Sequence, residues 1–113
     1  MIIGQFTDSF PPIADGVARV VQNYALWQHK DGDTCYVITP GVPGYSYEYP
    51  FPVLTYHSFS IPFKKNYRTG IPQFDRQFYN ELKKVKFDII HSHSPFPAGE
   101  LGRKIAYDQG IPF

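Results

Sequence analysis

Residues 2–30 read IIGQFTDSFPPIADGVARVVQNYALWQHK, and this stretch decides the fold. It opens with a short apolar run, residues 2–6, of the kind that is buried in a parallel sheet. A polar loop interrupted by two prolines follows. Apolar residues then recur at helical spacing, which predicts a helix that ends near His29, Lys30 and Gly32. These apolar residues are Val17, Val20, Val21, Tyr24 and Trp27.

The start of this helix has the features of an anion-binding site. Asp15 suits the N-cap position, and Gly16 allows the backbone to approach a bound group closely. Free N–H groups and the positive end of the helix dipole would face the same point. The sequence contains neither GxGxxG nor GxxxxGK(S/T), so the dinucleotide fingerprint and the P-loop are both excluded. The alternative is a tight strand-to-helix connection that binds no ligand.

Strand and helix patterns alternate along the rest of the chain. This alternation predicts an α/β fold, a doubly wound parallel sheet with helices on both faces and strand order 3-2-1-4-5. The last three residues have the composition of a strand that is just beginning, so we expect one truncated domain over residues 1–113. Two segments, 45–52 and 59–72, fit neither pattern. Further strands are expected at 34–39, 53–56 and 87–90, and helices at 74–85 and 97–109.

Composition limits the class of protein. The 113 residues, 42% of them hydrophobic, suit one globular domain, and the net charge of +1 gives no reason to expect a nucleic-acid partner. Cys35 is the single cysteine, which excludes an internal disulfide and a multi-cysteine zinc site. It lies in an apolar run, where we expect a buried, unreactive thiol. Neither a secretory signal nor an apolar run of about 20 residues is present, which predicts a cytoplasmic protein.

Two polar loops should meet at one edge of the sheet. In the predicted order strands one and four are neighbours, so loops 7–16 and 91–97 face each other across a crevice where ligands bind. His91 and His93 lie two residues apart at a strand end and should point to the same side. Three interpretations are open. The histidines form a metal pair completed by Asp8, or they contact substrate as donors to sugar hydroxyls or as acid or base, or one packs under the next helix while the other is solvated. Asp8 is also suited to bonding the N–H groups of its own turn.

Positive charge is concentrated in one part of the chain. Residues 64–86 carry seven basic and two acidic side chains, a net charge of +5 that leaves −4 for the remainder. Aromatic and cationic residues are mixed within 59–72, and one interpretation is insertion into a membrane interface with the cations against anionic headgroups. The alternative is a surface loop whose aromatic residues pack on their own domain. The residues concerned are Phe59, Phe63, Lys64, Lys65, Tyr67 and Arg68.

Two motifs, IIGQFTDSFPPIADGVARVV and FDIIHSHSPFPAGELGRKIAYDQGIPF, together resemble the N-terminal domain of glycosyltransferase family 4. Within the family they look most like bacterial glucosyltransferases that act on 1,2-diacylglycerol. The resemblance implies a GT-B architecture, in which two Rossmann-like domains enclose the active site between them. It implies a retaining transfer from a nucleotide sugar, typically UDP-glucose, to a lipid acceptor, with no metal and no cofactor. It also implies a protein peripheral to the inner face of the cell membrane.

The resemblance assigns roles to individual residues as well. Gly16 and Val17 match the loop that approaches the donor diphosphate. The family's catalytic histidine would follow the next strand, beyond Phe113, and its Glu-x-x-x-x-x-x-x-Glu signature belongs to the second domain. The resemblance therefore implies that these residues alone are inactive, as the acceptor side of a larger enzyme. The acceptor side matches Asp8, Asp15, His91, His93 and Ser94.

Two other functions fit the residue patterns. One is a non-catalytic α/β module that binds a phosphate ligand or a partner protein. The other is a metal-dependent hydrolase that uses His91, His93 and Asp8. The identity of an acceptor does not follow from the fold, because one scaffold serves many substrates.

The membrane interpretation predicts the effect of charge reversal in the basic segment. Replacing both lysines, Lys64→Glu with Lys65→Glu, should weaken binding to anionic vesicles, since each lysine contributes about 1 kcal/mol near such a surface. Co-sedimentation with anionic vesicles measures the effect, and uncharged phosphatidylcholine vesicles are the control. Equal binding of the variant and the unmodified protein would contradict the membrane interpretation.

Overall fold

The computed structural model describes residues 1–62 and 64–113, with the side chains of residues 64–66 left undescribed. Four parallel strands form a sheet in the order β3-β2-β1-β6, and two further strands pair as a separate antiparallel hairpin. The elements, in chain order, are β1 (Ile2–Phe6), α1 (Gly16–Lys30), β2 (Thr34–Pro40), β3 (Val53–Tyr56), β4 (Phe59–Ile61), β5 (Lys64–Thr69), η1 (Pro72–Phe74), α2 (Arg76–Lys84), β6 (Ile89–Ser92) and α3 (Pro97–Gln109).

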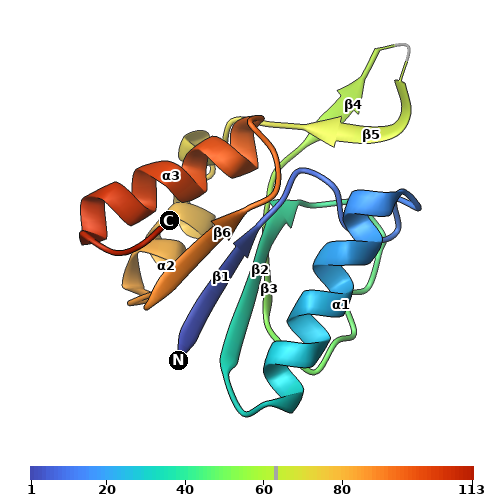
Figure 1. The fold of residues 1–113 in the computed structure, drawn as a ribbon. Helices are drawn as coiled ribbons and strands as arrows, with labels where there is room; N and C mark the ends of the chain where they lie inside the picture. The colour runs from blue at the N-terminus through green and yellow to red at the C-terminus, as the bar shows by residue number, and fades with distance from the viewer. Residues whose placement is uncertain (63) are drawn as a thin grey trace.

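The strand order confirms the predicted doubly wound, Rossmann-like sheet. β1 lies between β2 and β6, with Gly4 beside Tyr36 on one side and Ile90 on the other. Helix α1 covers one face, and α2 and α3 cover the opposite face (Figure 1). Beyond α3, the backbone N–H of Ile90 donates to the carbonyl oxygen of Pro112 at 3.1 Å. The last residues therefore run beside β6, where the predicted order places a fifth strand, although no strand is assigned to them.

Each face of the sheet has its own core. Side chains from β1, β2, β3 and β6 pack with α2 and α3 on one face, around Phe6, Leu82 and Leu101. On the other face α1 packs beside the segment 45–52, which the sequence left unassigned. Three rings of this segment surround Phe10, with ring centroids 5.3–6.4 Å apart. The irregular segment thus completes the core where a second helix is common in this fold class.

Helix α1 does not bury the stripe of residues that the hydrophobic spacing selects. The buried residues are Ala18, Val21 and Ala25, so the helix lies close to the sheet on small side chains. Of the predicted set only Val21 is buried, while Tyr24 is 45% and Trp27 61% exposed. Close approach of a helix to a sheet favours small residues at the contact, and the larger apolar side chains are left outside.

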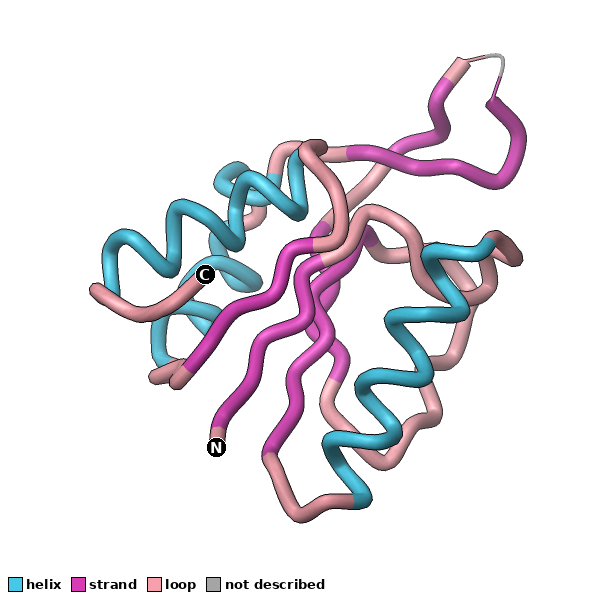
Figure 2. The backbone as a smooth tube through the Cα atoms, in the orientation of Figure 1, coloured by secondary structure: helices cyan, strands magenta, loops and turns pink. Residues whose placement is uncertain are grey.

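Three element boundaries differ from the sequence-based expectation. The segment 59–72 forms the β4–β5 hairpin, which projects away from the four-stranded sheet (Figure 2). Helix α2 begins at Arg76, because the Asp75 side chain caps it by accepting from the N–H of Phe78 at 3.2 Å. Phe74, predicted to lie in this helix, falls in η1 instead and is 79% exposed. β6 begins two residues late because the Asp88 carboxylate accepts from the N–H of Ile2 at 2.6 Å. Among the described residues, no helix has both the length and the apolar character needed to cross a membrane.

The turn into α3 depends on a glycine. A Cβ atom added at Gly99 would lie 1.6 Å from the carbonyl oxygen of Ser94, whereas at Gly16 nothing lies within 4 Å of the added atom. Gly99→Ala should therefore lower the free energy of unfolding by about 1–3 kcal/mol or more, because the backbone must move. Urea unfolding followed by circular dichroism measures this, with Gly16→Ala as the matched control. Equal midpoints for the two variants would contradict the packing described here.

Candidate functional site

A cavity of about 580 Å³ lies at the carboxyl ends of β1 and β6. It is bounded by the loop after β1, the first turn of α1, the β4–β5 hairpin and the loop before α3. This is the switch point of the sheet, where the sequence predicts a crevice between two polar loops. Its volume falls within the usual range for small-molecule sites. The walls are mainly apolar, from Val17, Ile61, Tyr67, Phe96 and Pro97, and the polar groups come from Asp8, Ser9, Asp15, Arg68, Thr69 and Ser94.

Asp8 joins the two loops of the cavity. Its carboxylate accepts from the N–H of Ala98 at 2.9 Å, from that of Gly99 at 3.4 Å and from the hydroxyl of Ser94. The residue at the N-cap position of α3 is Phe96, which makes no side-chain cap bond. Asp8 therefore caps α3 from the other loop, where a negative charge also suits the helix dipole. The sequence predicted that Asp8 bonds the N–H groups of its own turn. In the structure Asp8 instead accepts from N–H groups of α3.

Asp15 caps α1, as predicted, and also accepts a hydrogen bond from the β4–β5 hairpin. Its carboxylate accepts from the N–H of Ala18 at 2.8 Å, from the Ser9 hydroxyl at 2.7 Å and from the Tyr67 hydroxyl at 2.8 Å. Burial alone would raise the pKa of Asp15, but these hydrogen bonds outweigh it and hold the pKa below its ordinary value. Asp15 is consequently charged at neutral pH. Beside it, Gly16 is exposed, and the open space around it allows a ligand to approach the first turn of α1.

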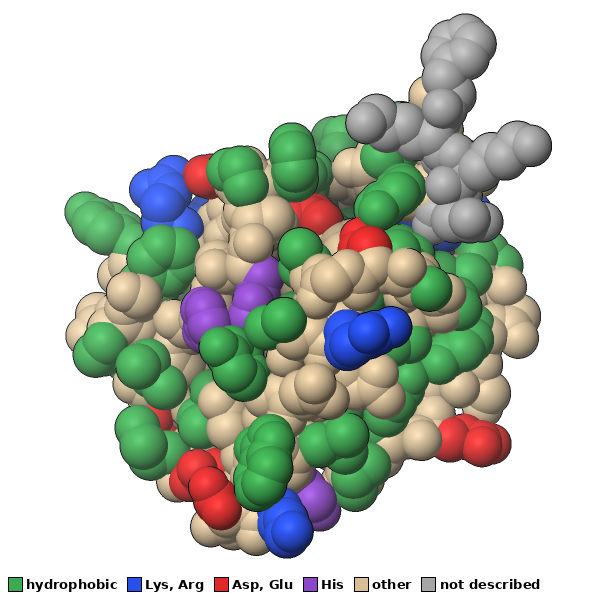
Figure 3. All heavy atoms as spheres, turned by 45° about the vertical axis from the view of Figure 1, so that its right-hand side comes forward, with side chains coloured by type: hydrophobic (Ala, Val, Ile, Leu, Met, Phe, Trp, Pro, Cys, Tyr) green, Lys and Arg blue, Asp and Glu red, His purple; other side chains and the backbone are tan. Residues whose placement is uncertain are grey.

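His91 and His93 point to the same side, as their spacing predicts, but they lie outside the cavity lining. Their ring centroids are 4.0 Å apart with the ring planes tilted by 33°, and both rings lie beside that of Tyr24 of α1, at centroid distances of 5.8 and 6.1 Å. Figure 3 shows two neighbouring histidine side chains on the surface, with hydrophobic side chains beside them. The Nε2 atom of His93 lies 2.6 Å from Oε1 of the fully buried Gln5. Burial first, and His91 second, lower the pKa of His93 to about 4, so its neutral ring donates to Gln5.

The three groups of the hydrolase alternative do not come together. Asp8 turns toward α3 and the histidine pair toward α1. Within residues 1–62 and 64–113 no group of three histidine, cysteine or carboxylate side chains could hold a metal ion. Cys35 is buried, and this burial raises its pKa to about 12, in agreement with the unreactive thiol expected there.

The structure describes the side chains of only some of the residues predicted to contact a membrane. Tyr67 and Arg68 line the cavity, while Phe59 is 57% exposed and lines a separate hollow. Phe63, and the side chains of Lys64 and Lys65, lie outside the described residues. The sequence analysis missed two apolar residues of that hollow, Ile71 and Phe74.

Other site residues were missed for lack of a local signal. Ile61 and Thr69 reach the cavity from the β4–β5 hairpin, and Phe96 reaches it from the loop before α3. Gln5 offered a usable signal, because a polar residue inside an otherwise apolar strand needs a buried partner; its Nε2 donates to Gln28 at 3.0 Å.

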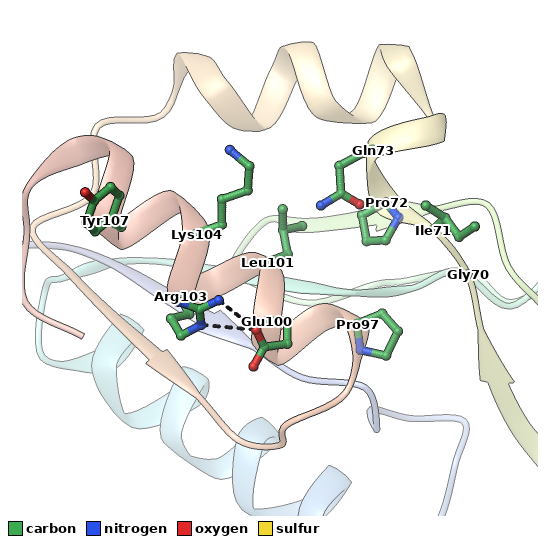
Figure 4. Close-up of a pocket in the computed structure, with 10 residues that line it drawn as sticks. All are labelled: Gly70, Ile71, Pro72, Gln73, Pro97, Glu100, Leu101, Arg103, Lys104 and Tyr107. Carbon is green, nitrogen blue, oxygen red and sulfur yellow. Dashed lines mark hydrogen bonds and ion pairs between the residues drawn. The ribbon is translucent and has the colours of Figure 1, made fainter.

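A further hollow of about 460 Å³ lies between α3 and η1 (Figure 4). In this view Arg103 and Glu100 of α3 are joined by dashed lines, and their closest charged atoms are 3.1 Å apart. Lys104, on the same helix, pairs with Asp108 at 2.8 Å. These are exposed ion pairs between neighbours on one helix, which contribute little energy and point to no ligand.

The histidine pair leads to a prediction about pH. Unfolded His93 takes up a proton near pH 6.5, whereas the folded protein takes it up only near pH 4. The unfolded state thus binds more protons between these values, so the free energy of unfolding should fall as the pH decreases through this window. The ring of His93 should titrate by NMR near pH 4. Tyr24→Ala, which uncovers the ring, should move that midpoint toward 6.5, whereas Tyr107→Ala on α3 should not; a native midpoint near 6.5 would contradict the burial described.

Comparison of the sequence with known proteins identifies its family. The sequence model of Glycosyltransferase Family 4 matches residues 14–113. Alpha-monoglucosyldiacylglycerol synthase of Acholeplasma laidlawii is 30% identical over 112 residues, which is 99% of this chain and 28% of the relative. The chain therefore spans less than a third of that protein's length. No solved structure matches the chain. With the family model covering nearly all of the sequence, the chain belongs to glycosyltransferase family 4.

Proposed function

We propose that this chain forms the N-terminal, acceptor-side domain of a retaining glycosyltransferase of GT-B architecture. The enzyme transfers a hexose, glucose from UDP-glucose, to a membrane lipid such as diacylglycerol. The family membership and the activity named for the relative support the reaction class. The observation that carries the proposal is the cavity at the switch point, which joins an apolar enclosure to a helix N-terminus.

The cavity suits an acceptor that is partly apolar. Val17, Ile61 and Phe96 provide walls for the glycerol and first acyl carbons of a lipid, because apolar groups gain free energy by leaving water. The carboxylates of Asp8 and Asp15 and the guanidinium of Arg68 supply the few polar contacts that orient a hydroxyl. A retaining transfer of this kind needs the acceptor hydroxyl held on the face from which the diphosphate leaves. The domain therefore acts by positioning the acceptor.

The first turn of α1 suits the donor side of the reaction. Gly16 is exposed, and no atom would contact a Cβ added there, so a diphosphate can approach the backbone of Gly16 and Val17. The positive end of the helix dipole stabilises the negative charge that develops as the diphosphate departs. In this proposal no resident metal or cofactor takes part, and the remaining donor contacts come from a second domain.

Exposed apolar residues support a membrane-facing surface next to the cavity. Phe59 of the hairpin, Ile71 and Phe74 of η1 line one hollow, and each is at least half exposed. Aromatic side chains of this kind enter the headgroup region of a bilayer, and nearby cations meet anionic lipids. Phe63, Lys64 and Lys65 belong to the same proposal on sequence grounds. Through this surface the protein would associate with the inner face of the cell membrane.

The proposal is tested by glucose transfer to diacylglycerol in anionic vesicles, using the protein encoded by the complete reading frame. Labelled UDP-glucose should yield a labelled glycolipid. Gly16→Val should lower kcat/KM by about 100-fold, since loss of a well-placed electrostatic contact to developing charge has an effect of this order. A Cβ atom added at this position meets no other atom within 4 Å, so we expect the fold to tolerate the substitution, and circular dichroism checks this.

Ala14→Val is the matched control, because Ala14 is exposed two residues away and does not line the cavity. This variant should keep most of its activity. A folded protein that gives no glycolipid product would contradict the proposed reaction. Equal activity of Gly16→Val and the unmodified enzyme would contradict the proposed donor contact alone.

A further inference from the structure

We propose that a groove at the carboxyl ends of β2 and β3 is a second binding site, and that its ligand is an uncharged pyranose sugar. The groove has a volume of about 530 Å³, close to that of the cavity at the switch point. None of the residues that line the groove lines that cavity. The proposal goes beyond the proposed transferase function and does not depend on it.

One wall of the groove is an aromatic surface held in place by its own hydrogen bonds. Tyr45 and Tyr47 line it, with ring centroids 4.7 Å apart and the rings nearly perpendicular. The Tyr47 hydroxyl accepts from the N–H of Val42 at 3.1 Å, and the Tyr45 hydroxyl lies 2.8 Å from that of Tyr49. Both lining rings are half-buried. Such rings lose little conformational freedom on binding and offer an apolar face beside a polar hydroxyl.

The opposite wall supplies hydrogen-bonding groups. Gln77 and Glu81 line the groove from α2 and are exposed, and Thr55 lines it from β3. Asp75, which caps α2, also lies within 3.7 Å of the exposed His57 ring. Together these side chains offer amide, hydroxyl and carboxylate groups that can both donate to and accept from ligand hydroxyls. The two walls therefore combine an apolar stacking surface with polar groups, as a pyranose ring requires.

The groove differs from the cavity at the switch point in lacking a strongly basic side chain. Each is lined by two carboxylates, Asp75 and Glu81 in the groove and Asp8 and Asp15 in the cavity. The cavity also holds Arg68, whereas within the described part of the chain neither lysine nor arginine lines the groove. A diphosphate or an anionic lipid headgroup would be repelled by the carboxylates of the groove. A neutral polyol would instead donate its hydroxyl protons to them, and hydrogen bonds to charged acceptors are the stronger kind. The volume accommodates one or two sugar rings and is too small for a folded partner.

The sugar can reach the groove in two forms, as a free saccharide or as the headgroup of a glycolipid. Titration of the isotope-labelled full chain, followed by NMR, distinguishes them. Methyl α-glucoside and maltose are the soluble probes, and phosphatidylcholine nanodiscs with and without glucosyldiacylglycerol are the membrane probes. UDP is the anionic comparison. The neutral probes should shift saturably the amide signals of the groove, and UDP should leave those signals unchanged.

Two variants test the assignment to this groove. Tyr45→Ala and Glu81→Gln should each weaken sugar binding by about tenfold, the effect expected for losing a charge-assisted hydrogen bond or its aromatic counterpart. The matched controls, Tyr107→Ala and Glu48→Gln, alter exposed side chains outside the groove and should bind normally.

Each outcome decides the proposal. Binding of soluble sugars and of glycolipid nanodiscs supports a general pyranose site, and binding of the nanodiscs alone supports a headgroup site. Absence of groove shifts with every neutral probe would overturn the proposal, as would equal affinity of all four variants. Neither result would bear on glucose transfer, which depends on the other cavity.

Discussion

The site depends on one long-range contact, the capping of α3 by Asp8. Asp8 and Ala98 are 90 positions apart in the chain, yet the Asp8 carboxylate joins the loop after β1 to the first turn of the last helix. A helix whose own N-cap residue is Phe96 would otherwise leave its first N–H groups without a partner. The same contact fixes two walls of the cavity relative to each other. The polar loops at the switch point are thus held by a structural hydrogen-bond network before any ligand arrives.

Local pattern predicted the parallel sheet because buried strands are short apolar runs, and the runs at 34–39 and 53–56 match β2 and β3 closely. Alternation and crossover handedness then predicted the strand order. Local pattern did not predict contacts that depend on side-chain size or on residues far apart in the chain. On α1 the hydrophobic spacing selected large apolar residues, whereas the contact with the sheet is made by small ones such as Ala18 and Ala25. Local pattern also could not pair Asp8 with Ala98, or place the hairpin over the cavity, because no local signal encodes those contacts.

The two hollows at the carboxyl edge of the sheet differ in charge although they are similar in size. Both are lined by two carboxylates, but the cavity beside β1 adds Arg68 and the open first turn of α1, whereas no lysine or arginine among the described residues lines the groove beside β3. The difference follows from the connections. β1 leads into a helix through an exposed glycine, while β2 leads into an irregular, tyrosine-rich segment. One sheet edge therefore presents two chemically different surfaces, each built by a different type of connection.

The exposed surface of α1 carries an intrinsic fluorophore. Trp27 is the single tryptophan, it is 61% exposed, and the Lys30 ammonium lies 5.4 Å from its ring centroid. Its fluorescence in the native state therefore comes from a largely hydrated indole, and unfolding changes that environment little. The emission wavelength therefore depends on the surroundings of the exposed surface of α1 and is a poor measure of core stability. Acrylamide quenching of this one indole would detect any burial of that surface without an attached dye.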